Sequence, residues 1–151
     1  MYKKKYLKYK LKYLDLKKKQ KGGSVTYESF NNGDKSELSY EKLMSELKKK
    51  NNKIMVVCYA PWCGHCKKFI NDADKYIKLV ESTEINIYKV DFTKEDENLN
   101  KIQQKLLELD NVLGQIGAFP TLLKIDTKTK KVSQYDGNRD DVTSIIKYFN
   151  E

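Results

Sequence analysis

The chain has 151 residues and a formal net charge of +9, and this length predicts one domain with a hydrophobic core of its own. The excess charge lies at the start, because residues 1–21 hold ten lysines and one aspartate, whereas residues 22–151 hold twenty basic and twenty acidic side chains. The charge of the body therefore gives no support to a polyanion-binding function. Three cysteines exclude a secreted scaffold that is held by several disulfides.

The first 21 residues consist mainly of lysine, tyrosine and leucine. At helical spacing the tyrosines form one stripe, and three leucines form a second stripe on nearly the opposite side. Two interpretations stay open: a solvated tail, or a basic segment that binds an anionic surface, either nucleic acid or membrane. A Gly-Gly-Ser segment then predicts a flexible joint. The expected domains are a leader of residues 1–23 and a folded domain of residues 24–151.

Targeting signals are not expected in this chain. The basic start has no uninterrupted apolar segment of the kind found in signal peptides. No stretch approaches the length of a transmembrane helix, and the last residues differ from a KDEL-type retention signal. We therefore expect the protein to be neither exported nor retained in the endoplasmic reticulum by a standard route.

The body predicts alternating strands and helices. Residues 25–30 alternate in polarity and predict a first strand, and a helix capped by Ser36 or Ser39 follows. Residues 54–59 are apolar on both faces, as in a central strand that is covered by helices on each side. One continuous helix is then predicted from Cys63 to about Val80.

The second half continues the alternation. The predicted elements are a strand at 85–92, a helix through Leu99, Ile102, Leu106 and Leu109, strands at 121–126 and 131–135, and a last helix with Val142, Ile145, Ile146 and Phe149 inward. The order βαβαβαββα predicts an α/β fold, with a mixed sheet and helices on both faces.

Cys63 and Cys66 are separated by two residues at the junction between the strand at 54–59 and the next helix. This placement predicts an exposed Cys63 sulfur at a helix N-terminus, where free N–H groups favour a thiolate. Cys66 lies about one turn deeper, close enough to close a small disulfide ring. The motif indicates disulfide exchange, with Cys63 as nucleophile and Cys66 as resolving thiol. The alternatives are two ordinary buried cysteines, or a zinc site for which the chain lacks a second ligand pair.

The motif and its surroundings also carry a family resemblance. Residues 59–68, Tyr-Ala-Pro-Trp-Cys-Gly-His-Cys-Lys-Lys, resemble the active site of the thioredoxin superfamily in the version found in protein disulfide isomerases. Three downstream segments resemble the next central strand, the cis-proline loop and the turn before the last helix of that family: Lys89-Val90-Asp91, Phe119-Pro120-Thr121 and Tyr135-Asp136-Gly137-Asn138-Arg139. The resemblance covers roughly residues 24–151.

The resemblance implies a thioredoxin fold and an oxidase- or isomerase-like thiol–disulfide oxidoreductase. The expected substrates are cysteine-containing proteins, a separate redox partner recycles the enzyme, and no metal or organic cofactor is needed. His65 is expected to stabilise the Cys63 thiolate, and the alternative is a passive surface histidine. Pro120 is expected to follow a cis bond that brings backbone against the sulfurs, and the alternative is a trans proline that opens an edge strand.

Two further residues have more than one interpretation. Trp62 is expected to pack beside the two sulfurs and to shape a docking surface, and the alternative is simple core filling. Arg139 matches an arginine that approaches the active site in isomerase domains and tunes the resolving thiol. A solvated surface arginine is the alternative.

One position departs from the family. Six residues before the first active cysteine the family usually has a buried acid that takes up the proton of the resolving thiol, and here that position is Val57. Lys89 matches the frequent lysine partner of that acid, so we expect it to lack its partner, and Cys66 to lose its proton slowly. Cys58 points to the opposite face from Val57 and is expected to serve only packing.

The leader has a resemblance of its own, to the Tyr/Lys/Leu-rich starts of proteins of giant, mimivirus-type DNA viruses. This resemblance and the missing targeting signals together predict a cytoplasmic or virion-associated protein. We expect it to be a monomer. The second functional hypothesis is a thioredoxin-fold adaptor or virion structural protein that is anchored by this leader and has vestigial redox activity.

Overall fold

The computed structural model describes residues 37–50, 52–83, 85–110, 116 and 118–151. These residues form α3 (Tyr40–Leu47), β1 (Lys53–Tyr59), α4 (Gly64–Ile70), α5 (Ala73–Thr83), β2 (Asn86–Asp91), α6 (Glu97–Leu109), β3 (Thr121–Asp126), β4 (Lys131–Gln134) and α7 (Val142–Asn150). The leader, the boundary after residue 23 and the strand predicted at 25–30 lie outside the described residues.

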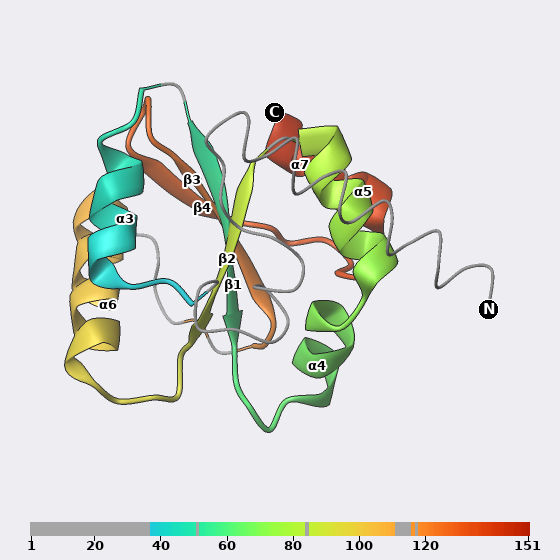
Figure 1. Ribbon diagram of the computed structural model, residues 1–151, viewed down its shortest axis with the longest axis horizontal. Coiled ribbons are helices and arrows are strands. Elements are labelled where there is room, and N and C mark those ends of the chain that lie inside the picture. The colour runs from blue at the N-terminus through green and yellow to red at the C-terminus, as the bar shows by residue number, and fades with distance from the viewer. Residues whose placement is uncertain (1–36, 51, 84, 111–115, 117) are drawn as a thin grey trace.

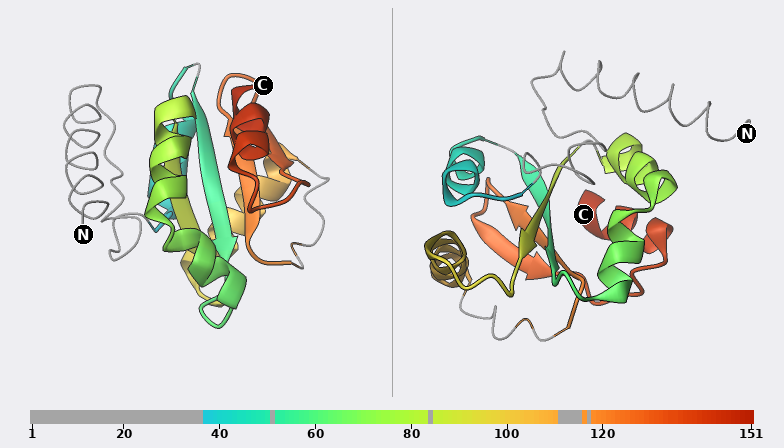
Figure 2. Two further views of the ribbon diagram at one scale, coloured as in Figure 1. Left: turned by 90° about the vertical axis from the view of Figure 1, so that its right-hand side faces the viewer. Right: turned by 60° about the horizontal axis from the view of Figure 1, so that its bottom comes forward.

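The described strands form one mixed sheet in the order β2-β1-β3-β4. Strand β1 pairs parallel with β2 and antiparallel with β3, and β3 pairs antiparallel with β4. Helices α3 and α6 cover one face of this sheet, whereas α4, α5 and α7 cover the other (Figures 1 and 2). The predicted α/β fold, with helices on both faces of a mixed sheet, is therefore confirmed.

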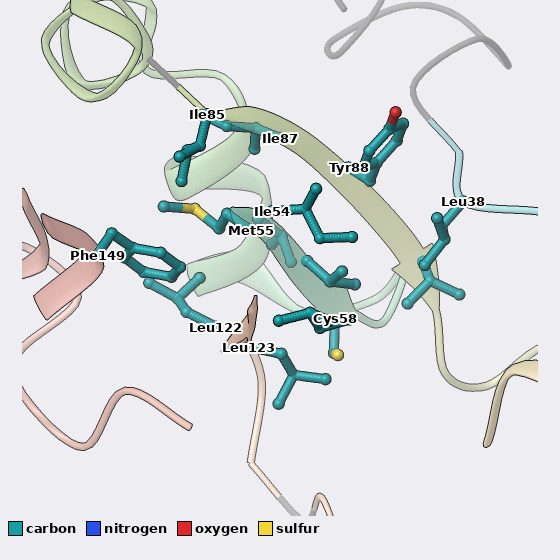
Figure 3. Packing of buried hydrophobic residues seen from close by; sticks show 14 of the residues in the cluster. Leu38, Ile54, Met55, Cys58, Ile85, Ile87, Tyr88, Leu122, Leu123 and Phe149 are labelled. Atoms are coloured by element: carbon teal, nitrogen blue, oxygen red, sulfur yellow. The ribbon is translucent and has the colours of Figure 1, made fainter. Parts of the chain in front are cut away.

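The core is centred on β1. Its residues from Ile54 to Cys58 are all fully buried, because one helical layer covers each face of this strand. Figure 3 shows how Met55, Leu122 and Phe149 approach one another from β1, β3 and α7. Each large apolar side chain that is buried in this way stabilises the fold by about 1.5–3 kcal/mol. The core thus fixes the end of β1, from which the cysteine motif continues.

The single helix predicted from Cys63 to Val80 is wrong, because the structure has two helices there. Helix α4 ends at Ile70 and is capped by Asn71, whose φ of −85° and ψ of 0° leave the helical region. The Asp72 carboxylate then accepts a 3.0 Å hydrogen bond from the backbone N–H of Lys75 in the first turn of α5. Asparagine and aspartate favour such caps over helix interiors. The apolar periodicity continues across the break and conceals it.

One of the two predicted N-caps lies in the described part of the chain. The Ser39 hydroxyl accepts a 3.1 Å hydrogen bond from the backbone N–H of Lys42, so α3 begins directly after Ser39. Ser36, the other candidate, lies outside the described residues. The cap fixes where the chain leaves the sheet, and Leu38 and Glu37 therefore run alongside β2 just before it.

Candidate active site

The candidate site lies where β1 ends and α4 begins, at the lower end of the sheet in Figure 1. The loop from Ala60 to Cys63 connects these two elements. Strand β3 runs antiparallel to β1 and pairs Thr121 with Cys58, so β3 begins at the same end of the sheet. The loop before β3, which carries Phe119 and Pro120, is thereby brought beside the cysteines, although it lies 56 residues away in the chain.

Cys63 is the N-cap of α4. Its φ of −82° and ψ of 113° are extended, and its Sγ accepts a 3.3 Å hydrogen bond from the backbone N–H of Cys66. The Cys63 thiol also donates to the carbonyl oxygen of Phe119 at 3.6 Å. The N–H of Cys66 is an unused donor of the first helical turn, and such donors bind an anionic sulfur better than a neutral one.

The expectation that Cys63 is exposed is wrong, because only 7% of the residue is accessible. The Phe119 carbonyl covers it from the loop before β3, and Ala60 and Cys66 pack against it. A substrate sulfur therefore has only this small accessible part of Cys63 to attack.

Cys66 lies deeper and is 1% exposed. The pKa of the Cys66 thiol is raised to about 12, mainly by burial and also by its hydrogen bond with the Cys63 thiol, while a hydrogen bond with the Ala60 backbone acts in the opposite direction. All three cysteines carry free thiols. At neutral pH Cys66 thus keeps its proton, and a reaction that uses its sulfur has to remove that proton.

The Phe119–Pro120 peptide bond is cis, as expected for this loop. Trp62 is 73% exposed, which contradicts core filling. Its ring makes an edge-to-face contact with Phe119, with 6.2 Å between the ring centroids and 82° between the ring planes. The two rings form an apolar surface beside Cys63, whose thiol donates to the Phe119 carbonyl, and aromatic pairs of this kind are typical of contact surfaces.

Arg139 lies on the other side of the same loop. Its Nε donates a 2.9 Å hydrogen bond to the carbonyl oxygen of Pro120, and the side chain is half-buried, so it is not simply solvated. His65 is exposed on α4 and borders a cleft of about 240 Å³ that Arg139 and Pro120 also line. The structure thus brings His65, Pro120 and Arg139 around one cleft next to the cysteine motif.

Comparison with known proteins identifies this architecture. The family model described as thioredoxin matches residues 34–151. The chain belongs to the thioredoxin family. It is 37% identical over 93 residues to the probable protein disulfide-isomerase A4 of Caenorhabditis elegans. This matching region covers 62% of this chain and 12% of that protein. It is 35% identical over 101 residues to the protein disulfide isomerase-like 2-2 of Oryza sativa subsp. japonica. Here the matching region covers 67% of this chain and 24% of that protein.

The chain spans less than a quarter of the length of these two relatives. Among solved structures, the thioredoxin f2 of Chlamydomonas reinhardtii matches with a TM-score of 0.51 and 19% identity, over 74% of this chain and 93% of that one. This similarity supports the fold.

Val57 departs from the usual thioredoxin-family pattern, and the structure shows what surrounds it. Val57 is fully buried, and its register partner in β2 is Lys89. The expectation that Lys89 lacks an acidic partner is wrong, because its Nζ lies 3.9 Å from Oε1 of Glu37. Sequence reasoning missed Glu37, since it placed the first strand further upstream. One signal in the sequence could have pointed to Glu37, namely its position just before Ser39, the N-cap of α3.

Cys58 is fully buried among the apolar side chains of the main core (Figure 3). Burial raises the pKa of its thiol, so Cys58 stays protonated and unreactive at neutral pH. This agrees with the expected packing role.

In the described part of the chain, no helix combines the length and the apolar character that crossing a membrane requires. The described residues also contain no group of three or more His, Cys, Asp or Glu side chains that could hold a metal ion.

Proposed function

We propose that this protein is a thiol–disulfide oxidoreductase that exchanges disulfides with cysteine-containing proteins through Cys63 and Cys66. The observation that carries the proposal is the arrangement of the two thiols: Cys63 Sγ accepts the Cys66 N–H at 3.3 Å and lies 3.6 Å from the Phe119 carbonyl. A sulfur that accepts an N–H donor of the first helical turn is suited to act as a nucleophile.

The proposed reaction needs only sulfur chemistry. The Cys63 thiolate attacks one sulfur of a substrate disulfide, a new S–S bond forms, and the other substrate sulfur leaves and takes up a proton. The Cys66 thiol then loses its proton and attacks the Cys63 sulfur. This step forms the Cys63–Cys66 disulfide and releases the second substrate thiol. Two electrons have passed to the substrate, and the reverse sequence oxidises a substrate dithiol.

We further propose that the preferred direction is oxidation or isomerisation. His65 follows Cys63 by two residues and is exposed at the cleft, from where its imidazole stabilises the Cys63 thiolate, as a cation or through N–H donation. Stabilisation of the thiolate stabilises the reduced form, and the disulfide becomes a better oxidant. Trp62 and Phe119 offer the apolar surface on which an extended substrate segment docks, and a separate redox partner restores the starting state.

The test is the reduction potential of the Cys63/Cys66 couple in glutathione buffers. Trp62 is the only tryptophan and is adjacent to Cys63, so its fluorescence reports the redox state. A midpoint near about −180 mV is expected for an oxidant or isomerase, whereas one near about −270 mV would indicate a reductase. Cys63→Ser and Cys66→Ser are the controls. A wild-type protein that shows no redox transition, with both thiols still titratable, would overturn the proposal.

A further inference from the structure

The further inference rests on the proposed function and concerns the proton of Cys66. The resolving step requires its thiolate, yet the residue is 1% exposed and burial raises its pKa to about 12. The side chain at position 57, on the sheet beneath the motif, is a fully buried valine that accepts no proton. A group elsewhere has to accept this proton if Cys66 is to react at a useful rate near neutral pH.

The sheet shows which residues can reach the α4 side. The Tyr88 hydroxyl donates a 3.0 Å hydrogen bond to Glu46 of α3, so Tyr88 faces the layer of α3 and α6. Successive residues of a strand point to opposite faces, and residues paired in register share a face. Lys89 and its partner Val57 therefore point to the layer of α4, α5 and α7, and so does Tyr59.

A carboxylate lies on that same face. Glu37 pairs with Lys89 as a parallel bridge, and the next residue, Leu38, donates its N–H to the Lys89 carbonyl at 2.8 Å. The Tyr59 hydroxyl donates a 2.5 Å hydrogen bond to Oε1 of Glu37, and the Lys89 ammonium lies 3.9 Å from the same oxygen. Two residues of the sheet thus orient the Glu37 carboxylate.

The charges around Glu37 suit a proton acceptor. The pKa of its carboxyl group is raised above the ordinary value, and burial is the main cause. The hydrogen bond from Tyr59 and the charge of Lys89 lower this pKa. The charge of Asp91 raises it slightly, and the charge of Lys94 lowers it slightly. The carboxylate is therefore more basic than an ordinary surface glutamate, and general bases work best when their pKa lies near the working pH.

Tyr59 connects this carboxylate to the cysteines. It packs against the cluster that Ala60 forms with Cys63 and Cys66, and the backbone of Ala60 hydrogen-bonds the Cys66 thiol. Tyr59 therefore packs against the cysteine cluster and donates its hydroxyl to Glu37.

We propose that Glu37 is a positioning residue for the resolving step, which takes up the Cys66 proton through the hydroxyl of Tyr59. Glu37, which already accepts the hydrogen bond of the Tyr59 hydroxyl, gains a proton as Cys66 loses one. The Cys66 thiolate attacks the Cys63 sulfur, and the bond between Cys63 and the substrate sulfur breaks. The proton on Glu37 then exchanges with solvent or returns to the departing substrate thiolate. Lys89 keeps the carboxylate ionised between turnovers.

The experiment uses the full-length reduced protein and 5,5′-dithiobis(2-nitrobenzoate) in a stopped-flow instrument. Attack by Cys63 releases the first thionitrobenzoate and leaves the second on Cys63. Attack by Cys66 releases the second, so the two phases of absorbance separate the nucleophilic step from the resolving step. For Glu37→Gln we expect an unchanged first phase and a second phase at least about tenfold slower at neutral pH. Glu41→Gln, which alters an exposed glutamate in the first turn of α3, is the matched control and should leave both phases unchanged.

The pH profile separates a proton relay from a loss of structure. In the wild type the second phase should rise with pH through the ionisation of Glu37 and then level off. In Glu37→Gln that rise should move to alkaline pH, toward the ionisation of Cys66 itself. Tyr59→Phe should show the same shift, Glu37→Asp should restore most of the rate, and Lys89→Met should move the rise to higher pH because the carboxylate loses its cation.

Two failures are distinguishable. If the wild type releases only the first thionitrobenzoate, Cys66 does not resolve the mixed disulfide, and the proposed function itself fails. If the wild type releases both, and Glu37→Gln and Tyr59→Phe keep the wild-type second phase and pH profile, only the role of Glu37 is overturned.

Discussion

The Nε of Arg139 donates a 2.9 Å hydrogen bond to the carbonyl oxygen of Pro120. The residue before this proline, Phe119, places its own carbonyl 3.6 Å from the Cys63 sulfur. A side chain from the turn before α7 therefore holds the loop that covers the nucleophile. This is a different role from tuning the resolving thiol, which sequence reasoning had assigned to Arg139.

Arg139→Ala should loosen this loop. The Pro120 carbonyl loses a charge-assisted hydrogen bond, so we expect a decrease of about 1–2 kcal/mol in the free energy of unfolding and a several-fold slower attack by Cys63 on a protein disulfide. Urea unfolding and stopped-flow kinetics measure the two effects. Lys68→Ala is the matched control, because Lys68 lines the same cleft and carries the same charge. Equal effects of both substitutions would show that charge matters and that the hydrogen bond does not.

Trp62→Ala should affect substrates of different size unequally. The side chain is 73% exposed, so its loss should change the free energy of unfolding by less than about 0.5 kcal/mol. Exchange with a protein disulfide should slow about tenfold because the docking surface is lost, whereas exchange with oxidised glutathione should change little. Quenched samples analysed by mass spectrometry give both rates without tryptophan fluorescence. Leu107→Ala removes another large exposed apolar side chain, on α6, and should leave both rates unchanged. Equal slowing with both substrates would contradict a docking role.

The periodicity of the sequence predicted most of the fold. The apolar run before Cys63 indicated a central strand, and β1 is buried on both faces. The cysteine motif at a strand–helix junction indicated where the site lies. These features are local, because they depend on residues that are neighbours in the chain or on one face of a helix or strand.

Features that depend on distant contacts could not be predicted from periodicity. The approach of the Phe119 carbonyl to Cys63, 56 residues away, was expected only from the family resemblance of the cis-proline loop, and the hydrogen bond of Tyr59 to Glu37 across 22 residues was missed. Both contacts follow from the register of strands and from the segment alongside β2, which no periodicity encodes. The break between α4 and α5 was missed for the opposite reason, since the apolar pattern continues on either side of Asp72 and outweighs a single capping residue.

Stability at alkaline pH should report the burial of Cys66. Its thiol has a pKa of about 12 in place of the ordinary 9.0. Between these values the unfolded chain releases the proton and the folded chain retains it, so the free energy of unfolding falls as the pH rises; below about pH 9 both states are protonated and the contribution is constant. Burial raises the pKa values of Cys58 and Tyr88 as well, in the same direction.

Cys66→Ala removes this one contribution. Urea unfolding of the reduced proteins should show a stability difference between wild type and variant that is constant below about pH 9 and changes in favour of the variant above it. Cys58→Ala should behave in the same way, because Cys58 is fully buried. A difference that stays constant from about pH 8 to about pH 11 would mean that the folded protein opens enough to ionise Cys66 at its ordinary pKa.

Val57→Glu places a carboxyl group on the sheet face that Lys89 and Tyr59 share. The position is fully buried, so the new group should lower the free energy of unfolding by about 1–3 kcal/mol, and Val57→Gln gives the same bulk without the charge. If Glu37 already serves Cys66, Val57→Glu should leave the resolving step of the wild type nearly unchanged. In the Glu37→Gln background the same substitution should restore the rate at neutral pH, whereas Val57→Gln should not. A large acceleration in the wild-type background would show instead that the natural protein lacks an effective acceptor, and that its resolving step is slow because position 57 is apolar.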